Sequence, residues 1–407
     1  MTQQAITGAA LPERDRWILV GGGLAGMAWF YIGLLHPWDL AHSFMVGAPI
    51  GRDFVNFWLG GHLALQDHLD LLIDPQGYNA LIAQMFGHNP LDEFVFSYPP
   101  HALMFLLPFG AMPFGAAVLL WTALNLYCVF RAVELMRGRL ELAALACLGP
   151  AVLMMVVYGH FDGFLALLAT FVLIEGHRRP RLAGLCLALM TVKPQLALMF
   201  GVYLLLIGHW RVVAVSVPAT LALVAISIIT FGLRPWEDFI TWTVPYHAEL
   251  ISGFVLSQLK STISLYAGVR MLGLPGWLAQ TIQWLFSFAI LAGAVIVHAR
   301  RGPEPRSVAI GLSAVVLALP YANAYDLALA APALTLALFA ESEGDEHLFL
   351  PFIPALVFWT LPAFASIFGA AAWPVLPIGL AAILLFAIAR EASGRSTAEA
   401  IWAMGRR

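Results

Sequence analysis

Apolar runs long enough to cross a lipid bilayer recur along the chain, and they constrain its fold more than any other feature. The first, at 17–35, is followed by others of similar character at 114–136, 211–231 and 277–298. A helix needs about 20 apolar residues to cross the hydrocarbon core. Because 61% of the 407 residues are hydrophobic and only 11% are charged, the sequence predicts an all-α polytopic membrane protein.

Shorter apolar runs complete the predicted topology, at 141–157, 161–175, 182–192, 195–207, 307–319, 326–340, 348–364 and 373–390. Together they predict a bundle of about 12 transmembrane helices that forms a single domain over 1–407. We expect the first run to be a retained anchor, because no small-residue cleavage site follows it. The segment Lys193-Pro194-Gln195 separates two runs too short for ordinary spans, which predicts a hinge at membrane depth.

The charges orient this bundle in the membrane. Of the 21 lysines and arginines, 16 fall on the predicted cytoplasmic side, as the positive-inside bias requires. Residues 36–113 contain one cation, Arg52, among seven acidic residues, so we expect a long first extracytoplasmic loop there. Its segment 98–113 is apolar and proline-bounded, which predicts a re-entrant or interfacial helix. A second outer loop is expected at 232–276, with a possible interfacial helix at 261–273.

Several functional classes are excluded or left without support. No basic stripe is present, so we expect no nucleic-acid partner. The three cysteines, Cys128, Cys147 and Cys186, lie within apolar runs at uneven spacing, which favours packing over a disulfide framework or a metal site. The histidines lack metal-ligand spacing, so no metal and no cofactor are expected.

The polar stretch from Gly51 to Trp58 lies near the start of the first outer loop. It places Asp53 beside an arginine and among three aromatic residues. A carboxylate in this position suits general base catalysis on a sugar hydroxyl. The alternative is that Asp53 caps a helix or pairs with Arg52 in a solvated loop.

Four further outer cations are candidates for binding a phosphate: Lys193, Arg234, Lys260 and Arg270. Lys193 is the strongest, because a proline-broken helix end exposes backbone groups beside its ammonium. Each of the four could instead extend to the membrane interface. His160 and Asp162 follow Tyr158 at an expected outer span end and suit either an acceptor hydroxyl or a polar helix junction. Asp326 suits a substrate contact or a helix N-cap.

The order of several short motifs resembles glycosyltransferase family 87, over roughly 45–340. The matching elements are Arg-Asp-Phe-x-x-Phe-Trp at 52–58, the Tyr-Pro-Pro run at 98–100, Tyr-Gly-His at 158–160, Lys-Pro-Gln at 193–195, Gly-His-Trp-Arg at 208–211, and Pro-Tyr at 320–321 with Tyr-Asp at 325–326. Two positions depart from the family pattern. The turn usually written Gly-Gln-x-Asn is Gly159-His160-Phe161-Asp162 here, and Tyr325 stands where some members carry histidine.

This resemblance implies a GT-C membrane hexosyltransferase similar to polyprenol-phosphate-mannose-dependent α-mannosyltransferases. It would move a hexose, with mannose the first candidate, from a polyprenyl-phosphate donor to a glycolipid or glycan acceptor, with inversion. The active site would face the periplasm from the plasma (inner) membrane, among membrane lipids. Asp53 corresponds to the catalytic base. Substrate contacts are expected from Arg52, Asn56, Trp58, Tyr98, His160, Asp162, Gln195, Tyr325 and Asp326.

A transporter or flippase for a lipid-linked sugar is the alternative from another class, since it also needs broken helices and charge near the bilayer midplane. The chain shows no internal repeat relating two halves, and the loop at 36–113 has no later counterpart. These two features favour the enzyme.

Overall fold

The computed structural model describes residues 42–43, 48–49, 51–86, 95–253, 262–339, 359 and 375–393. Apart from one antiparallel pair of two-residue strands, β1 (His42–Ser43) and β2 (Ala48–Pro49), the regular structure of these residues is helical. The predicted all-α class is therefore confirmed.

Three helices are long and apolar enough to cross a membrane, and each coincides with a predicted span. They are α5 (Phe114–Leu135), α11 (Trp210–Phe231) and α15 (Gly276–Arg301). Their outer surfaces carry large apolar side chains, as Leu119 on α5, Ile229 on α11 and Phe288 on α15 illustrate. Exposed apolar surface of this extent suits lipid rather than water, so the protein is a membrane protein.

The predicted span at 141–157 is not a continuous helix. It consists of α6 (Leu140–Cys147) and α7 (Pro150–Tyr158), which meet at a bend of 50°. Pro150 has no backbone N–H to donate to the preceding turn, and its ring clashes with that turn, so it can begin a helix but not continue one. Counting this pair as one broken span gives up to four spans among the described residues. The predicted total of about 12 is thus not confirmed.

Shorter helices fill the rest of the bundle: α8 (Asp162–Glu175), α9 (Pro180–Leu189), η2 (Met190–Val192), α10 (Pro194–Leu206), α16 (Pro305–Leu317), η5 (Ala324–Leu329), α17 (Ala331–Phe339) and α20 (Val375–Ser393). The predicted break is present, because Lys193 has a non-helical backbone between η2 and α10. The expected spans at 17–35 and 348–364 lie outside the described residues, except for Trp359.

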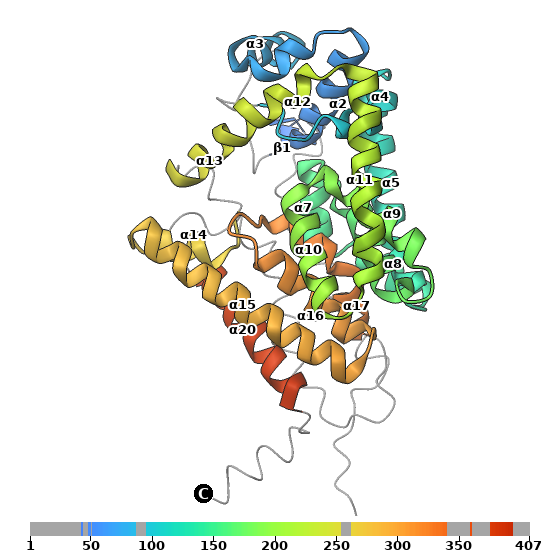
Figure 1. The fold of residues 1–407 in the computed structure, drawn as a ribbon, viewed down its shortest axis with the longest axis vertical. Helices are drawn as coiled ribbons and strands as arrows, with labels where there is room; N and C mark the ends of the chain where they lie inside the picture. The colour runs from blue at the N-terminus through green and yellow to red at the C-terminus, as the bar shows by residue number, and fades with distance from the viewer. Residues whose placement is uncertain are drawn as a thin grey trace, which may run out of the picture.

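Both predicted outer loops contain helices. The first includes α2 (Arg52–Leu65), η1 (Leu69–Ile73), α3 (Pro75–Phe86) and α4 (His101–Gly110), and the second includes α12 (Arg234–Asp238), η3 (Phe239–Thr243), α13 (Val244–Gly253) and α14 (Leu265–Met271). Helices α4 and α14 fall within the segments expected to be interfacial. In Figure 1, α2, α3, α4 and α12 gather at one end of the molecule, beyond the bundle.

Two glycines allow α2 and α4 to pack with their backbones in contact. A Cβ atom on Gly61 would lie 2.3 Å from the carbonyl oxygen of Leu106, and one on Gly110 would lie 2.3 Å from the carbonyl carbon of Gly61. Any side chain at either position would force the helices apart. Trp58 adds a hydrogen bond from its Nε1 to the carbonyl of Met112, at 2.9 Å. These contacts fix α2, and with it Asp53, against α4 and the residue Met112 that follows it.

Candidate functional site

A buried ion cluster joins three segments that lie far apart in the sequence. Asp162 begins α8, Lys193 precedes α10, and Asp326 lies in η5. The Lys193 ammonium lies 3.2 Å from Oδ1 of Asp162 and donates a second, short hydrogen bond to Oδ1 of Asp326. Each of these side chains is at most 8% exposed. Charges this deeply buried require partners, and here the carboxylates and the ammonium satisfy each other.

His160 extends the cluster toward the protein surface. Its Nδ1 lies 2.5 Å from Oδ2 of Asp162, and its Nε2 lies 3.1 Å from the Tyr98 hydroxyl. An ionised carboxylate can only accept hydrogen bonds, so Nδ1 of His160 donates. In a neutral imidazole this leaves Nε2 to accept from the tyrosine hydroxyl. The chain Tyr98–His160–Asp162 is thus continuously hydrogen-bonded.

Aromatic rings enclose this chain. Tyr325 stacks on His160 with ring centroids 4.3 Å apart, and Phe161 stacks on His160 at 4.6 Å. The Lys193 ammonium also lies 5.4 Å from the ring centroid of Tyr325, within the range of a cation–π contact. The rings exclude water from the cluster, which strengthens its ion pairs.

Local sequence explains how Asp326 reaches the cluster. Asn323 and Asp326 form a reciprocal capping box at the start of η5, in which Oδ2 of Asp326 accepts from the Asn323 backbone N–H at 2.6 Å. The N-cap of η5 is Asn323, and Asp326 is its reciprocal partner at the third helical position, a role that does not exclude a second one. One carboxylate oxygen caps the helix while the other binds Lys193.

Asp53 lies in the first turn of α2, and that turn packs directly on the turn that carries His160. The Gly51 backbone N–H donates to the Val157 carbonyl at 3.0 Å. Gly159 has φ +71°, and a Cβ atom there would lie 2.7 Å from the Cα of Gly51. Only glycine allows both this left-handed backbone and this close approach. The two turns are thereby held together.

The charge of Asp53 acts on two hydroxyls at the edge of the cluster. Burial, and after it the charge of Asp53, raise the pKa of the Tyr98 hydroxyl well above its usual value, and the pKa of Tyr325 rises for the same two reasons. Asp53 is only partly buried, whereas Asp162 and Asp326 are enclosed. Of the three carboxylates, Asp53 is therefore the one that a ligand outside the cluster can reach.

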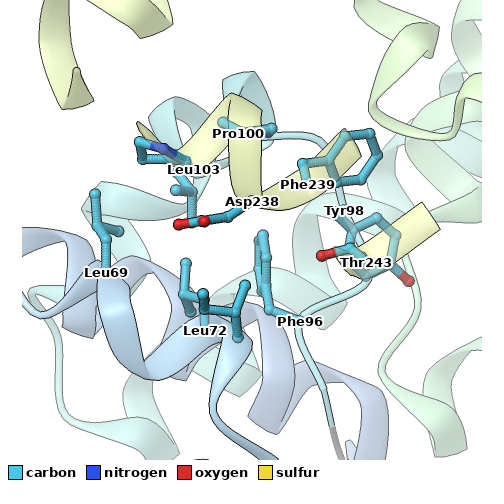
Figure 2. Close-up of a pocket in the computed structure, with 11 residues that line it drawn as sticks. Leu69, Leu72, Phe96, Tyr98, Pro100, Leu103, Asp238, Phe239 and Thr243 are labelled. Carbon is cyan, nitrogen blue, oxygen red and sulfur yellow. The ribbon is translucent and has the colours of Figure 1, made fainter. Parts of the chain in front are cut away.

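A small pocket, with room for little more than a water molecule, lies beside Tyr98 between η1 and the α12–η3 segment. Leu69, Leu72 and Phe239 are among its mostly apolar lining, and Figure 2 shows the Asp238 carboxylate reaching between the leucine side chains. Tyr98 therefore belongs both to the pocket and to the hydrogen-bonded chain.

Two residues that were predicted to contact the substrate make polar contacts within the protein. The side-chain amide of Asn56 donates to the Val95 carbonyl at 2.9 Å, and its oxygen accepts from the Tyr78 hydroxyl at 2.5 Å. The indole N–H of Trp58 is bonded to Met112, and the residue is buried. Both polar groups are engaged within the protein, and these bonds hold α2 against its neighbours.

Three other predicted residues, among those that the structure describes, lie outside the cluster. Gln195 is exposed on the first turn of α10. Arg234 has 80% of its side chain exposed and pairs with Asp238 at 3.6 Å. Arg270 donates to the Leu274 carbonyl at 3.1 Å. Lys260 and the side chain of Arg52 are outside the described part of the chain.

Sequence reasoning did not identify Asp238 or Phe239 as pocket residues. One signal was present, because Glu237 and Asp238 are adjacent acidic residues within an aromatic segment of the second outer loop. That signal did not predict that Asp238 and Phe239 face η1. Helix η1 supplies the opposite wall of the pocket and lies more than 160 residues earlier in the chain.

Three residues of the cluster have the composition of a metal site. One ligand atom from each of His160, Asp162 and Asp326 lies within 4.8 Å of the other two. The sequence shows no sign of this set, because Asp326 is far from His160 and Asp162 in the chain and is brought to them only by the fold. The Lys193 ammonium already contacts both of its carboxylates.

Comparison with known proteins gives one match. Residues 96–320, more than half of the chain, match the model of Glycosyltransferase family 87. Neither the curated proteins nor the solved structures gave a match. The matched range includes the cluster residues Tyr98, His160, Asp162 and Lys193 but begins after Asp53 and ends before Asp326.

Proposed function

The chain belongs to glycosyltransferase family 87, and from this premise we propose that it transfers a hexose from a polyprenyl-phosphate donor to a hydroxyl of a glycan or glycolipid. Membership makes the protein a membrane glycosyltransferase, and mannose is the first candidate for the sugar. The proposal needs a base at the acceptor hydroxyl and positive charge at the departing phosphate, because negative charge accumulates there in the transition state.

Asp53 is the proposed general base, and the observation that carries this proposal is its position. Its turn packs on the His160 turn, and its charge acts on the hydroxyls of Tyr98 and Tyr325. In the reaction, the acceptor oxygen attacks the anomeric carbon from the face opposite the phosphate and gives its proton to Asp53. The bond from the anomeric carbon to the phosphate oxygen breaks, so the configuration inverts and polyprenyl phosphate leaves.

Asp162 and Asp326 are unsuited to this task. Both are bonded to Lys193, and neither side chain is more than 3% exposed. A base must lie within hydrogen-bond reach of the proton that it removes, and an enclosed carboxylate cannot meet an incoming hydroxyl. We therefore assign them to holding the site together.

Arg234 is a better candidate than Lys193 for binding the phosphate of the donor. The Lys193 ammonium is enclosed between two carboxylates, whereas the Arg234 side chain is largely exposed beside the pocket. Its planar guanidinium suits bidentate contact with a phosphate. Arg270 and Lys260 remain further candidates for the same role.

We propose that the site faces the periplasm from the inner membrane, in a GT-C-like bundle of about 12 spans that needs no cofactor. The charge bias of the loops supports this orientation. Substrate contacts from Tyr98 and Tyr325, at the edge of the ion cluster, fit the same arrangement.

The proposal is tested with the purified protein in lipid vesicles, given radiolabelled polyprenyl-phosphate mannose and a panel of glycan and glycolipid acceptors. We expect label to move to an acceptor with release of polyprenyl phosphate. Movement of the intact donor across the bilayer without bond cleavage would instead identify a flippase. Parallel donors carrying glucose, galactose or arabinose would identify the sugar.

A further inference from the structure

The His160, Asp162 and Asp326 side chains form a ligand set of the kind that holds a divalent cation. One imidazole and two carboxylates are common ligands of Zn²⁺. Their ligand atoms lie within 4.8 Å of one another, and all three residues are buried. Two of these three side chains are carboxylates, and buried carboxylates require a positive charge beside them.

Lys193 supplies that charge from the chain itself. Its ammonium bonds to Oδ1 of Asp162 and to Oδ1 of Asp326, the place where the two carboxylates converge. The same nitrogen lies within 5.8 Å of the Phe161 ring centroid and 5.4 Å of the Tyr325 ring centroid. The ammonium is therefore held by oxygen atoms and π faces together, and it contacts two of the three groups of the set directly, while His160 bonds to Asp162.

We propose that Lys193 is the built-in cation of a metal-type ligand set, and that removing its side chain converts the set into a Zn²⁺ site. The ammonium holds the α8, α10 and η5 segments together in the way a structural metal ion would. This inference does not rest on the proposed sugar transfer, because its test measures metal binding and stability rather than activity.

Four proteins test it: the parent, Lys193→Ala, Lys193→Met and Lys193→Ala with Asp326→Asn. Alanine removes the charge and leaves space for an ion. Methionine also removes the charge but fills that space with an apolar chain. The double variant carries one carboxylate fewer, which restores the parental net charge of the cluster while deleting one ligand.

We measure zinc content after chromatography, and Tm with Zn²⁺, with Mg²⁺ or with EDTA. The parent should hold no zinc at the cluster, and its Tm should not respond to EDTA. Lys193→Ala should have a lower Tm, bind about one more Zn²⁺ per chain than Lys193→Met does, and gain at least about 5 °C with Zn²⁺. Mg²⁺ should give no gain, because it prefers a water-rich octahedral shell. The double variant should have a higher Tm than metal-free Lys193→Ala and a smaller response to Zn²⁺.

Lys193→Met serves as the background for zinc held by other histidines. The inference is overturned if Lys193→Ala binds no more zinc than Lys193→Met, or if EDTA lowers the Tm of the parent. If Lys193→Ala does not fold without added metal, it is produced with Zn²⁺ present. Failure to fold there, while the double variant folds, would also contradict the inference.

Discussion

Asp53 and the pair Asp162 and Asp326 are carboxylates of one site in opposite surroundings. Asp53 lies in the first turn of an outer helix and is partly buried. The pair is enclosed, bonded to Lys193, and connected through His160 to Tyr98. The difference separates two tasks, because a base must meet a substrate whereas an enclosed ion pair fixes the backbone segments that surround it. Variants should therefore divide into those that lose stability and those that lose turnover.

The largest effect on stability is expected from Asp326→Ala. It leaves the Lys193 ammonium with one carboxylate fewer and removes half of the η5 capping box. Breaking a buried ion pair typically costs about 3–5 kcal/mol of unfolding free energy. Denaturation followed by circular dichroism in detergent measures the loss. Asp70→Ala, at an exposed carboxylate of η1, is the control and should change stability by no more than about 0.5 kcal/mol.

An unchanged unfolding curve for Asp326→Ala would contradict the structural role that we assign to Asp162 and Asp326. Asp326 would then be as eligible for the catalytic step as Asp53, and the contrast between the two regions would disappear.

A smaller effect, on donor use, is expected from Arg234→Ala. A charge-assisted hydrogen bond to phosphate contributes about 1.5–3 kcal/mol, so kcat/KM for the polyprenyl-phosphate donor should fall by roughly 10- to 150-fold. Stability should hardly change, because the side chain is 80% exposed. Initial rates at varied donor concentration measure this. Arg178→Ala removes a comparably exposed arginine from the turn before α9 and should leave the donor KM at the parental value; an equal loss in both variants would argue against phosphate binding by Arg234.

The smallest effect is expected from Tyr98→Phe. It removes one hydrogen bond to His160 and keeps the ring, so stability should fall by about 0.5–1.5 kcal/mol. Because the charge of Asp53, the proposed base for the acceptor hydroxyl, acts on the Tyr98 hydroxyl, acceptor KM should rise while the donor KM stays constant. Tyr127→Phe changes an exposed tyrosine on α5 and should do neither. A parental acceptor KM in Tyr98→Phe would argue against a contact between Tyr98 and the acceptor.

Long apolar runs made part of the fold predictable. Helices α5, α11 and α15 coincide with runs at 114–136, 211–231 and 277–298, and the proline at 194 marked the break before α10. The break at Pro150 was missed because its neighbours are uniformly apolar, so hydropathy alone indicates a continuous span. Helix α2 was missed because its sequence mixes polar and aromatic residues within an expected loop.

The site was predictable as a set of residues but not as an arrangement. His160, Asp162, Lys193 and Asp326 each stand out as polar residues at the ends of apolar runs. That Lys193 pairs with Asp326, 133 residues later, depends on how α10 and η5 pack, which local sequence does not specify. Lys193 was therefore expected at a phosphate and is instead found between two carboxylates.

The most direct test of the account is the transfer rate of Asp53→Asn. The amide keeps the shape of the carboxylate but cannot take the acceptor's proton, a task typically worth about 10²- to 10⁴-fold in rate. Sugar transfer by purified, folded Asp53→Asn should therefore fall by about that factor, with Tm and donor binding near parental values. Asp53→Glu should recover little, because the added methylene displaces the base by roughly 1 Å. Transfer at the parental rate by folded Asp53→Asn would contradict the assignment of Asp53 as the base.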